Sequence, residues 1–175
     1  MNRFLRYLRY DWPLHFALFI TNWFPDNVIF LRLRGRMAAP FVGACMGNLR
    51  LARNILFHNP ANIRLGKDVF MAYGCLVMAT DIIEIADEVM MGPYCVVVSG
   101  NHLRASGSFR YGSDYLAPIH IGKGVWLGSH VIVTAGAKIG TGCLIAAGAV
   151  VSGEIPCDSM AGGMPARVIK ELSDS

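Results

Sequence analysis

His102 is the side chain whose type and place in this sequence most suit acid–base chemistry. It lies near the start of SGNHLRASGSFR, residues 99–110, where a regular pattern of aliphatic residues stops. A histidine can take or give a proton near neutral pH, which suits a general base. Loops carried by a rigid scaffold are frequent places for such a site. The structural alternative is a loop histidine bonded to nearby backbone, and the surrounding elements have to decide between the two.

Composition limits what this histidine can serve. The chain has 175 residues, which is one domain's worth, and 54% of them are hydrophobic while 16% are charged. An average soluble protein has roughly a quarter charged residues, so we expect much surface to be hidden in an oligomer. The net charge of +4 favours anionic partners. The arginines gather at residues 3–9 and 32–36, which is too local for nucleic-acid binding.

The cysteines and the other histidines show no metal-ligand spacing. Five cysteines are an odd number without a CxxC pair, which argues against a disulfide framework and against zinc. Three of them fall at equivalent places in the repeat described below and are predicted to be small core residues of a reduced, cytoplasmic protein: Cys75, Cys95 and Cys143. The histidines without coherent spacing are His15, His58, His120 and His130. We therefore expect no metal.

The N-terminal segment, residues 3–36, is basic and apolar. Asp11, Pro13 and His15 interrupt it before the apolar region of a signal peptide could form. The run from Phe16 to Phe24 is too short to span a bilayer. Two interpretations stay open: helices packed on the body, or peripheral contact with a membrane, at the inner membrane surface. Packing is favoured, because long apolar helices in small domains usually serve the core.

From residue 51 onward the sequence is a repeat of six residues. One aliphatic register contains Leu51, Phe57, Leu65, Met71, Val77, Ile85, Met91, Val97, Ile121, Leu127, Val133, Ile139, Ile145 and Val151. A period of six fits short strands joined by tight turns, and three strands close a triangular coil of about 18 residues. Between Val97 and Ile121 the register misses 18 residues. We expect that excess to project as a loop with His102 at its root.

The later hexads carry a specific resemblance. IGKGVW, LGSHVI, VTAGAK, IGTGCL, IAAGAV and VSGEIP, followed by GGMPARVIK, resemble the hexapeptide-repeat acyltransferases over about residues 51–171. FMAYGCLVMATD, and NH before PIHIGKGVWLG, resemble their galactoside, maltose and polysaccharide O-acetyltransferase branch. The resemblance implies a mainly β fold, a left-handed parallel β-helix, and a homotrimer that uses acetyl-CoA. We expect an N-terminal helical segment at 1–45, a β-helix at 46–160 with a catalytic loop at 101–118, and a cofactor-binding tail at 161–175.

The resemblance also implies roles for individual residues. His102 would take the proton of a sugar hydroxyl as that hydroxyl attacks the thioester in a ternary complex, since no serine or cysteine acyl-enzyme motif is present. The backbone N–H of Ser129 is a candidate oxyanion donor. Trp126 is expected to pack against the loop or the cofactor arm. The other cofactor-binding candidates are Ala147 beside the pantetheine arm, Ser152, and Arg167 with Lys170 at the phosphates.

The acceptor side matches the family less well. Asp81 corresponds to a family carboxylate, but Tyr73 stands where the family has an asparagine. On the cofactor side, Gly153 stands where a lysine is common. Further acceptor-binding candidates in the loop are Asn101, Arg104 and Arg110. The sequence therefore leaves the acceptor's identity open.

These observations favour an acetyl-CoA-dependent O-acetyltransferase for a carbohydrate hydroxyl, with surface-polysaccharide synthesis as a candidate role. An antibiotic, an amino acid or an amino sugar is the alternative acceptor on the same fold. A metal enzyme like the γ-class carbonic anhydrases would need three converging histidines, which the hexads lack. A non-catalytic scaffold would explain the repeats but not a loop rooted in a histidine together with PARVIK.

Overall fold

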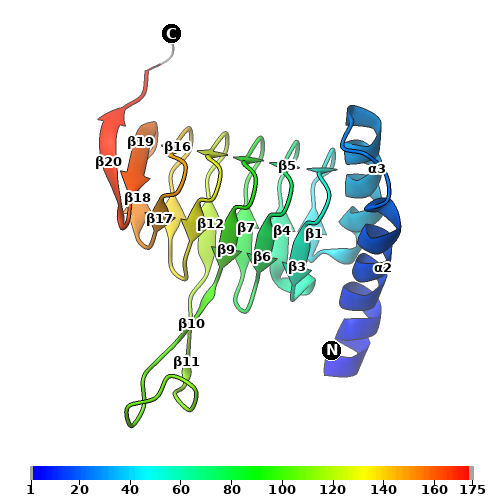
Figure 1. Ribbon diagram of the computed structural model, residues 1–175, viewed down its shortest axis with the longest axis horizontal. Coiled ribbons are helices and arrows are strands. Elements are labelled where there is room, and N and C mark those ends of the chain that lie inside the picture. The colour runs from blue at the N-terminus through cyan, green and yellow to red at the C-terminus, as the bar shows by residue number, and fades with distance from the viewer. Residues whose placement is uncertain (1, 174–175) are drawn as a thin grey trace.

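The chain forms a parallel β-helix that carries helices at one end and a projecting hairpin on its side (Figure 1). The computed structural model describes residues 2–173. The predicted fold class is confirmed in its three parts, the β-helix, the N-terminal helical segment and the projecting segment. Residues 1, 174 and 175 of the predicted terminal segments lie outside the described part.

Three sheets form the sides of the β-helix, and each coil except the last adds one strand to each sheet. Sheet A contains β1 (Ala44–Cys45), β4 (Ile63–Leu65), β7 (Ile83–Ile85), β12 (Ile119–Ile121), β15 (Lys138–Ile139) and β18 (Glu154–Ile155). Sheet B contains β2 (Arg50–Leu51), β5 (Phe70–Met71), β8 (Met90–Met91), β13 (Trp126–Leu127), β16 (Leu144–Ile145), β19 (Ser159–Gly163) and the antiparallel β20 (Ala166–Glu171). Sheet C contains β3 (Leu56–His58), β6 (Leu76–Met78), β9 (Val96–Val98), β14 (Ile132–Val133) and β17 (Val150–Val151).

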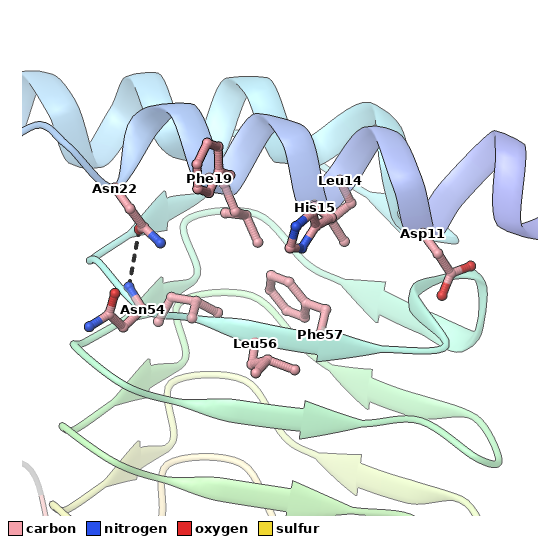
Figure 2. A pocket seen from close by; sticks show the side chains of 10 residues that line it. Asp11, Leu14, His15, Phe19, Asn22, Asn54, Leu56 and Phe57 are labelled. Atoms are coloured by element: carbon pink, nitrogen blue, oxygen red, sulfur yellow. Dashed lines mark hydrogen bonds between the residues drawn. The ribbon is translucent and has the colours of Figure 1, made fainter.

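The core of the β-helix is the predicted aliphatic register. Every register side chain except Phe57 is at most 3% exposed. Phe57 is partly buried and lies beneath the helices (Figure 2). The predicted core cysteines are confirmed as buried free thiols: Cys75, Cys95 and Cys143. The period of six in the sequence thus corresponds to a column of side chains stacked from coil to coil.

The N-terminal helices lie across the first coil. They are α1 (Arg3–Arg6), the π-helix η1 (Tyr7–Asp11), α2 (Trp12–Thr21) and α3 (Val28–Ala38), and two short 3-10 turns follow, η2 (Ala39–Phe41) and η3 (Pro60–Asn62). Pro13 lies in the first turn of α2, and the Asn27 side chain caps α3 by accepting from the Phe30 N–H at 3.1 Å. Leu14 and Leu18 join the core, which confirms packing on the body. No helix in residues 2–173 has the length and apolarity needed to cross a membrane.

Arg34 connects the helices to the β-helix. Its side chain is fully buried, and its Nη1 donates to the Leu51 carbonyl at 2.6 Å and to Asp26 at 3.2 Å. Its Nη2 donates to the carbonyls of Thr21 at 3.0 Å and Phe24 at 3.1 Å. Burial lowers the pKa of the Arg34 guanidinium, and Asp26 acts in the opposite direction. The planar fork of donors thereby holds both helices and the strand β2 together.

The outer surfaces of the three sheets differ in character. Sheet A carries a row of charged and polar side chains, in which Glu84 lies 2.5 Å from Arg64 and 2.9 Å from His120. Sheets B and C instead present apolar side chains outward, among them Met90, Trp126, Leu56 and Ile132. Two sides of the β-helix are therefore suited to burial against another chain, and one is suited to water.

Candidate active site

The interrupting segment is a β-hairpin with an ordered stem. Its strands are β10 (Gly100–His102) and β11 (Asp114–Leu116), which leave the β-helix between β9 and β12 (Figure 1). The Leu103 N–H donates to the Ser113 carbonyl at 2.8 Å and extends the stem. A Cβ added at Gly112 would lie 1.6 Å from the Leu103 carbonyl oxygen. The two arms thus approach too closely for any side chain at that position.

The hairpin brings His102 against a carboxylate. His102 and Asp114 are directly opposite each other in the antiparallel ladder, and His102 Nδ1 lies 2.9 Å from Asp114 Oδ1. With the Nδ1 proton directed at the carboxylate, Nε2 carries the lone pair that can accept a proton. The side chains are 72% and 57% exposed, so the pair is open to solvent in a single chain. Sequence reasoning missed Asp114, because nothing but the hairpin register places it opposite His102.

A hollow of about 320 Å³ lies beside this pair. Its apolar lining comes from Met78, Val98 and Leu116, and its polar lining includes Thr80, Asn101, His102 and Asp114. Asn101 thus lines the hollow next to His102, and its role in binding the acceptor stays a prediction. Arg104 and Arg110 lie farther along the hairpin and are exposed, and the Arg110 guanidinium carbon lies 5.9 Å from the centre of the Tyr111 ring.

Asp81 lies near the hairpin root, at the turn after β6. Its Oδ1 accepts from the Ile82 N–H at 2.7 Å, and its own N–H donates to Ser99 Oγ at 2.9 Å. The buried Ser99 hydroxyl donates in turn to the Asp81 carbonyl at 2.9 Å. The Ile82 N–H thus engages one carboxylate oxygen, and the two bonds with Ser99 fix the Asp81 backbone at the turn.

Ser129 and Ala147 meet at a different corner, on neighbouring coils. The Gly148 N–H donates to the Ser129 carbonyl at 2.9 Å, and a Cβ added at Gly128 would lie 2.7 Å from the Ala147 nitrogen. For the Ser129 N–H, no acceptor is found within residues 2–173. Trp126 lies on the outer surface of β13 and is 48% exposed. The two predicted cofactor residues are thus adjacent, beside a backbone donor with no acceptor in the described chain.

Tyr73 belongs to this second corner as well. Its hydroxyl accepts from the Asn54 side-chain amide at 2.6 Å, and its ring packs edge-on against Tyr94, with centroids 5.4 Å apart. Tyr94 stacks on His130 at 5.2 Å, and His130 follows Ser129 directly. Tyr73 is therefore one member of an aromatic column along the corner, and in this chain it does not meet Asp81.

The predicted site residues consequently form two groups at opposite ends of sheet C. Tyr73 and Ser129 precede the strands β6 and β14, whereas Asp81 and His102 follow β6 and β9. These strands are parallel neighbours in one sheet. A single chain does not bring His102 to Ser129.

The remaining cofactor candidates lie toward the C-terminal end. Ser152 and Gly153 are exposed after β17. Arg167 and Lys170 are exposed on β20, where Lys170 lies opposite Met160 and the Arg167 Nη1 donates to the Ala166 carbonyl at 2.9 Å. Within residues 2–173 no three His, Cys, Asp or Glu side chains form a group that could hold a metal ion.

Comparison with known proteins identifies relatives of this sequence and this fold. A family model described as bacterial transferase hexapeptide (six repeats) matches residues 118–153. The galactoside O-acetyltransferase of Escherichia coli (strain K12) is 32% identical over 120 residues, which are 69% of this chain and 59% of that protein. The maltose O-acetyltransferase from Clostridium difficile 630 superposes with a TM-score of 0.83 at 28% identity, over 97% of this chain and 89% of that chain. The chain belongs to the hexapeptide-repeat acyltransferases.

Other members extend the comparison. A galactoside acetyltransferase solved in complex with coenzyme A shares the fold, with a TM-score of 0.77 and 24% identity over 97% of this chain and 82% of that chain. The first curated relatives are longer, and the chain spans 55% to 59% of their lengths. The likeness in sequence and in structure thus falls among the galactoside and maltose O-acetyltransferases of the superfamily.

Proposed function

We propose that this chain is an acetyl-CoA-dependent O-acetyltransferase of a sugar hydroxyl, with His102 as its general base and Asp114 as the residue that orients it. The observation that carries the proposal is the 2.9 Å approach of His102 Nδ1 to Asp114 beside a hollow of about 320 Å³. Two relatives are named for the acetylation of sugars, galactoside and maltose. A precursor of a surface polysaccharide is the acceptor class that we put forward within this activity.

The chemistry assigned to these residues is one direct transfer. As the acceptor hydroxyl oxygen bonds to the thioester carbonyl carbon, its proton passes to Nε2 of His102, and Asp114 stabilises the imidazolium that forms. Negative charge develops on the carbonyl oxygen, where the Ser129 N–H is the candidate donor. The carbon–sulfur bond then breaks, and His102 returns the proton to the thiolate of CoA.

The cofactor residues fit an extended, anionic thioester. Ala147 is small and exposed at the corner beside Ser129, so it leaves room for a narrow chain. Arg167 and Lys170 supply two exposed positive charges at the C-terminal end of the β-helix, which suits phosphate groups. Ser152 and Trp126 are the further candidates for contact with the cofactor. Coenzyme A is present in the solved galactoside acetyltransferase that shares this fold.

A homotrimer would complete the site. His102 and Ser129 lie at opposite ends of sheet C in one chain, so the histidine of one subunit needs the cofactor corner of a neighbour. The apolar outer surfaces of sheets B and C provide two sides that a closed ring would cover. In that ring the acceptor would enter through the hollow that Asn101 lines, next to Asp81.

The experiment is turnover of acetyl-CoA, followed by the release of free CoA thiol, against sugars, nucleotide sugars, lipid-linked glycans, amino sugars and antibiotics. With the acceptor found, His102→Ala should lower kcat by roughly 10²- to 10⁴-fold while the affinity for acetyl-CoA is retained. His58→Ala, an exposed histidine on β3, is the matched control and should retain kcat. Turnover near the wild-type rate in folded His102→Ala would refute the assignment.

A further inference from the structure

The N-terminal helices expose an apolar surface on the side that faces away from the β-helix. On α2 the residues buried against the body are Leu14, Ala17, Leu18 and Thr21. The opposite side carries Trp12, Phe16 and Ile20, and Trp23 follows the helix; Phe16 is 64% exposed and Trp23 81%. Steps of three and four residues place them on one side of the helix. These four residues, with Val28 and Ile29 of α3, are called the outer apolar face.

The N-terminal segment that carries this surface also carries all of the chain's net charge. Residues 1–40 contain six arginines and two aspartates, a net charge of +4, whereas residues 41–175 contain ten basic and ten acidic residues. Asp26 is paired with Arg34 and Arg53. Asp11 lines the pocket between α2 and the first coil and lies on the β-helix side of the helix (Figure 2). Arg32 and Arg36, in contrast, are exposed on α3 and line one groove with Val28 and Ile29.

From this juxtaposition we infer that the outer apolar face, with Arg32 and Arg36, docks on the surface of an anionic lipid bilayer. Tryptophan and other large apolar side chains enter the interface between headgroups and acyl chains, and arginines bind the lipid phosphates. The helices would lie on the bilayer, because none in residues 2–173 is long and apolar enough to cross it. A second copy of this chain fits the outer apolar face less well, since the N-terminal helices of each copy would present their positive charge to those of the other.

The place of the helices in the fold agrees with such docking. They lie at one end of the β-helix, while the hairpin that carries His102 projects from its side (Figure 1). A bilayer against the helices would therefore leave the candidate active site uncovered. If the proposed trimer has its axis along the β-helices, the N-terminal helices of its three subunits face the same plane. They would then bind one bilayer surface together, with increased avidity.

The test is sedimentation of the full chain with vesicles. Vesicles of phosphatidylcholine containing about a third of phosphatidylglycerol should bind the protein, vesicles of phosphatidylcholine alone should bind much less, and salt should weaken the binding. The double variant Phe16→Ser/Trp23→Ser should lower the partition coefficient by about 100-fold. The double variant Arg32→Gln/Arg36→Gln should lower it by about 30-fold.

Two matched controls change exposed residues elsewhere. Tyr111→Ser removes a large side chain that is 84% exposed on the hairpin, and Lys67→Gln/Lys123→Gln removes two charges from the turns between sheets A and B. Each control should lower the partition coefficient by less than about threefold. Losses of binding in the controls equal to those in the two variants of the N-terminal helices would overturn the inference. Equal binding to neutral and anionic vesicles, or no binding to anionic vesicles, would also overturn it.

Tryptophan fluorescence tests the same docking without any substitution in the N-terminal helices. In Trp126→Phe the remaining tryptophans are Trp12 and Trp23, both on the outer apolar face. Anionic vesicles should shift their emission to shorter wavelength, and brominated lipid should quench it. Emission that anionic vesicles leave unchanged would overturn the inference. A change in the oligomeric size of the Phe16→Ser/Trp23→Ser variant would also overturn the inference, because the outer apolar face would then join copies of the chain. The sedimentation and the fluorescence experiments both measure binding to vesicles, so a negative result in them would leave the proposed acetyl transfer untouched.

Discussion

Replacement of Asp114 by asparagine keeps the size of the side chain and removes the charge that faces His102. The carboxylate can only accept, and at 2.9 Å it holds the proton on His102 Nδ1. An amide can also donate, so the imidazole of the variant can instead carry its proton on Nε2. In that tautomer His102 cannot accept the proton of the acceptor hydroxyl.

The size of the effect follows from the exposure of the pair. A hydrogen bond with a charged partner contributes about 1.5 to 3 kcal/mol. Both side chains are more than half exposed, so solvent screens part of that interaction. We expect about 1.4 to 2 kcal/mol to be lost in the transition state, which corresponds to a fall in kcat of roughly 10- to 30-fold. A buried carboxylate in the same position would have a larger effect.

The assay is steady-state release of CoA thiol. The KM for acetyl-CoA should change by less than about twofold, because Asp114 contacts His102 and is assigned no contact with the cofactor. Asp114→Asn introduced into His102→Ala should cause no further loss, since Asp114 acts through the histidine. A wild-type kcat in the single variant, or an undiminished further loss in the double variant, would refute this reasoning.

Three further predictions concern other parts of the molecule. Arg34→Met should lower the free energy of unfolding in urea by about 3 to 5 kcal/mol, because it removes a fully buried charge that is bonded to Asp26 and three carbonyls. Arg167→Gln/Lys170→Gln should weaken CoA binding in calorimetry by about 10- to 100-fold and binding of dephospho-CoA much less. Burial raises the pKa of the Cys143 thiol, so near pH 8 iodoacetamide should modify the exposed Cys157 and leave Cys143 as unreactive thiol.

Each of these has a specific control or contrary outcome. Arg32→Met, on the exposed side of α3, should change the free energy of unfolding by less than about 0.5 kcal/mol at the same protein concentration; an equal effect would remove the special role of the buried arginine. Equal losses for CoA and dephospho-CoA would contradict binding of the 3′-phosphate. Labelling of Cys143 as fast as Cys157 in mass spectra of folded protein would contradict its burial.

The sequence predicts the β-helix well because its signal is local and repeated. Each residue such as Val77 or Val97 enters the core for the same reason, and the places where six-residue steps stop mark the hairpin and His102. Asp114 could not be predicted, since its approach to His102 depends on the register of one hairpin in an irregular segment. Within one chain β6 separates Tyr73 from Asp81 by the length of a coil side, and their joint role at the acceptor stays a prediction. Sequence spacing alone does not say which corner of a coil a residue occupies.

The shared site is tested most directly by mixing two inactive variants. His102→Ala removes the base, and Ala147→Trp obstructs the cofactor corner that a neighbouring subunit would supply. Unfolded together and refolded as random mixed trimers, they place an intact histidine opposite an intact corner at about a quarter of the interfaces. We predict that activity returns to about a quarter of the wild-type rate. Mixed trimers verified by native mass spectrometry that stay inactive would contradict a site built from His102 of one subunit and Ala147 of the next.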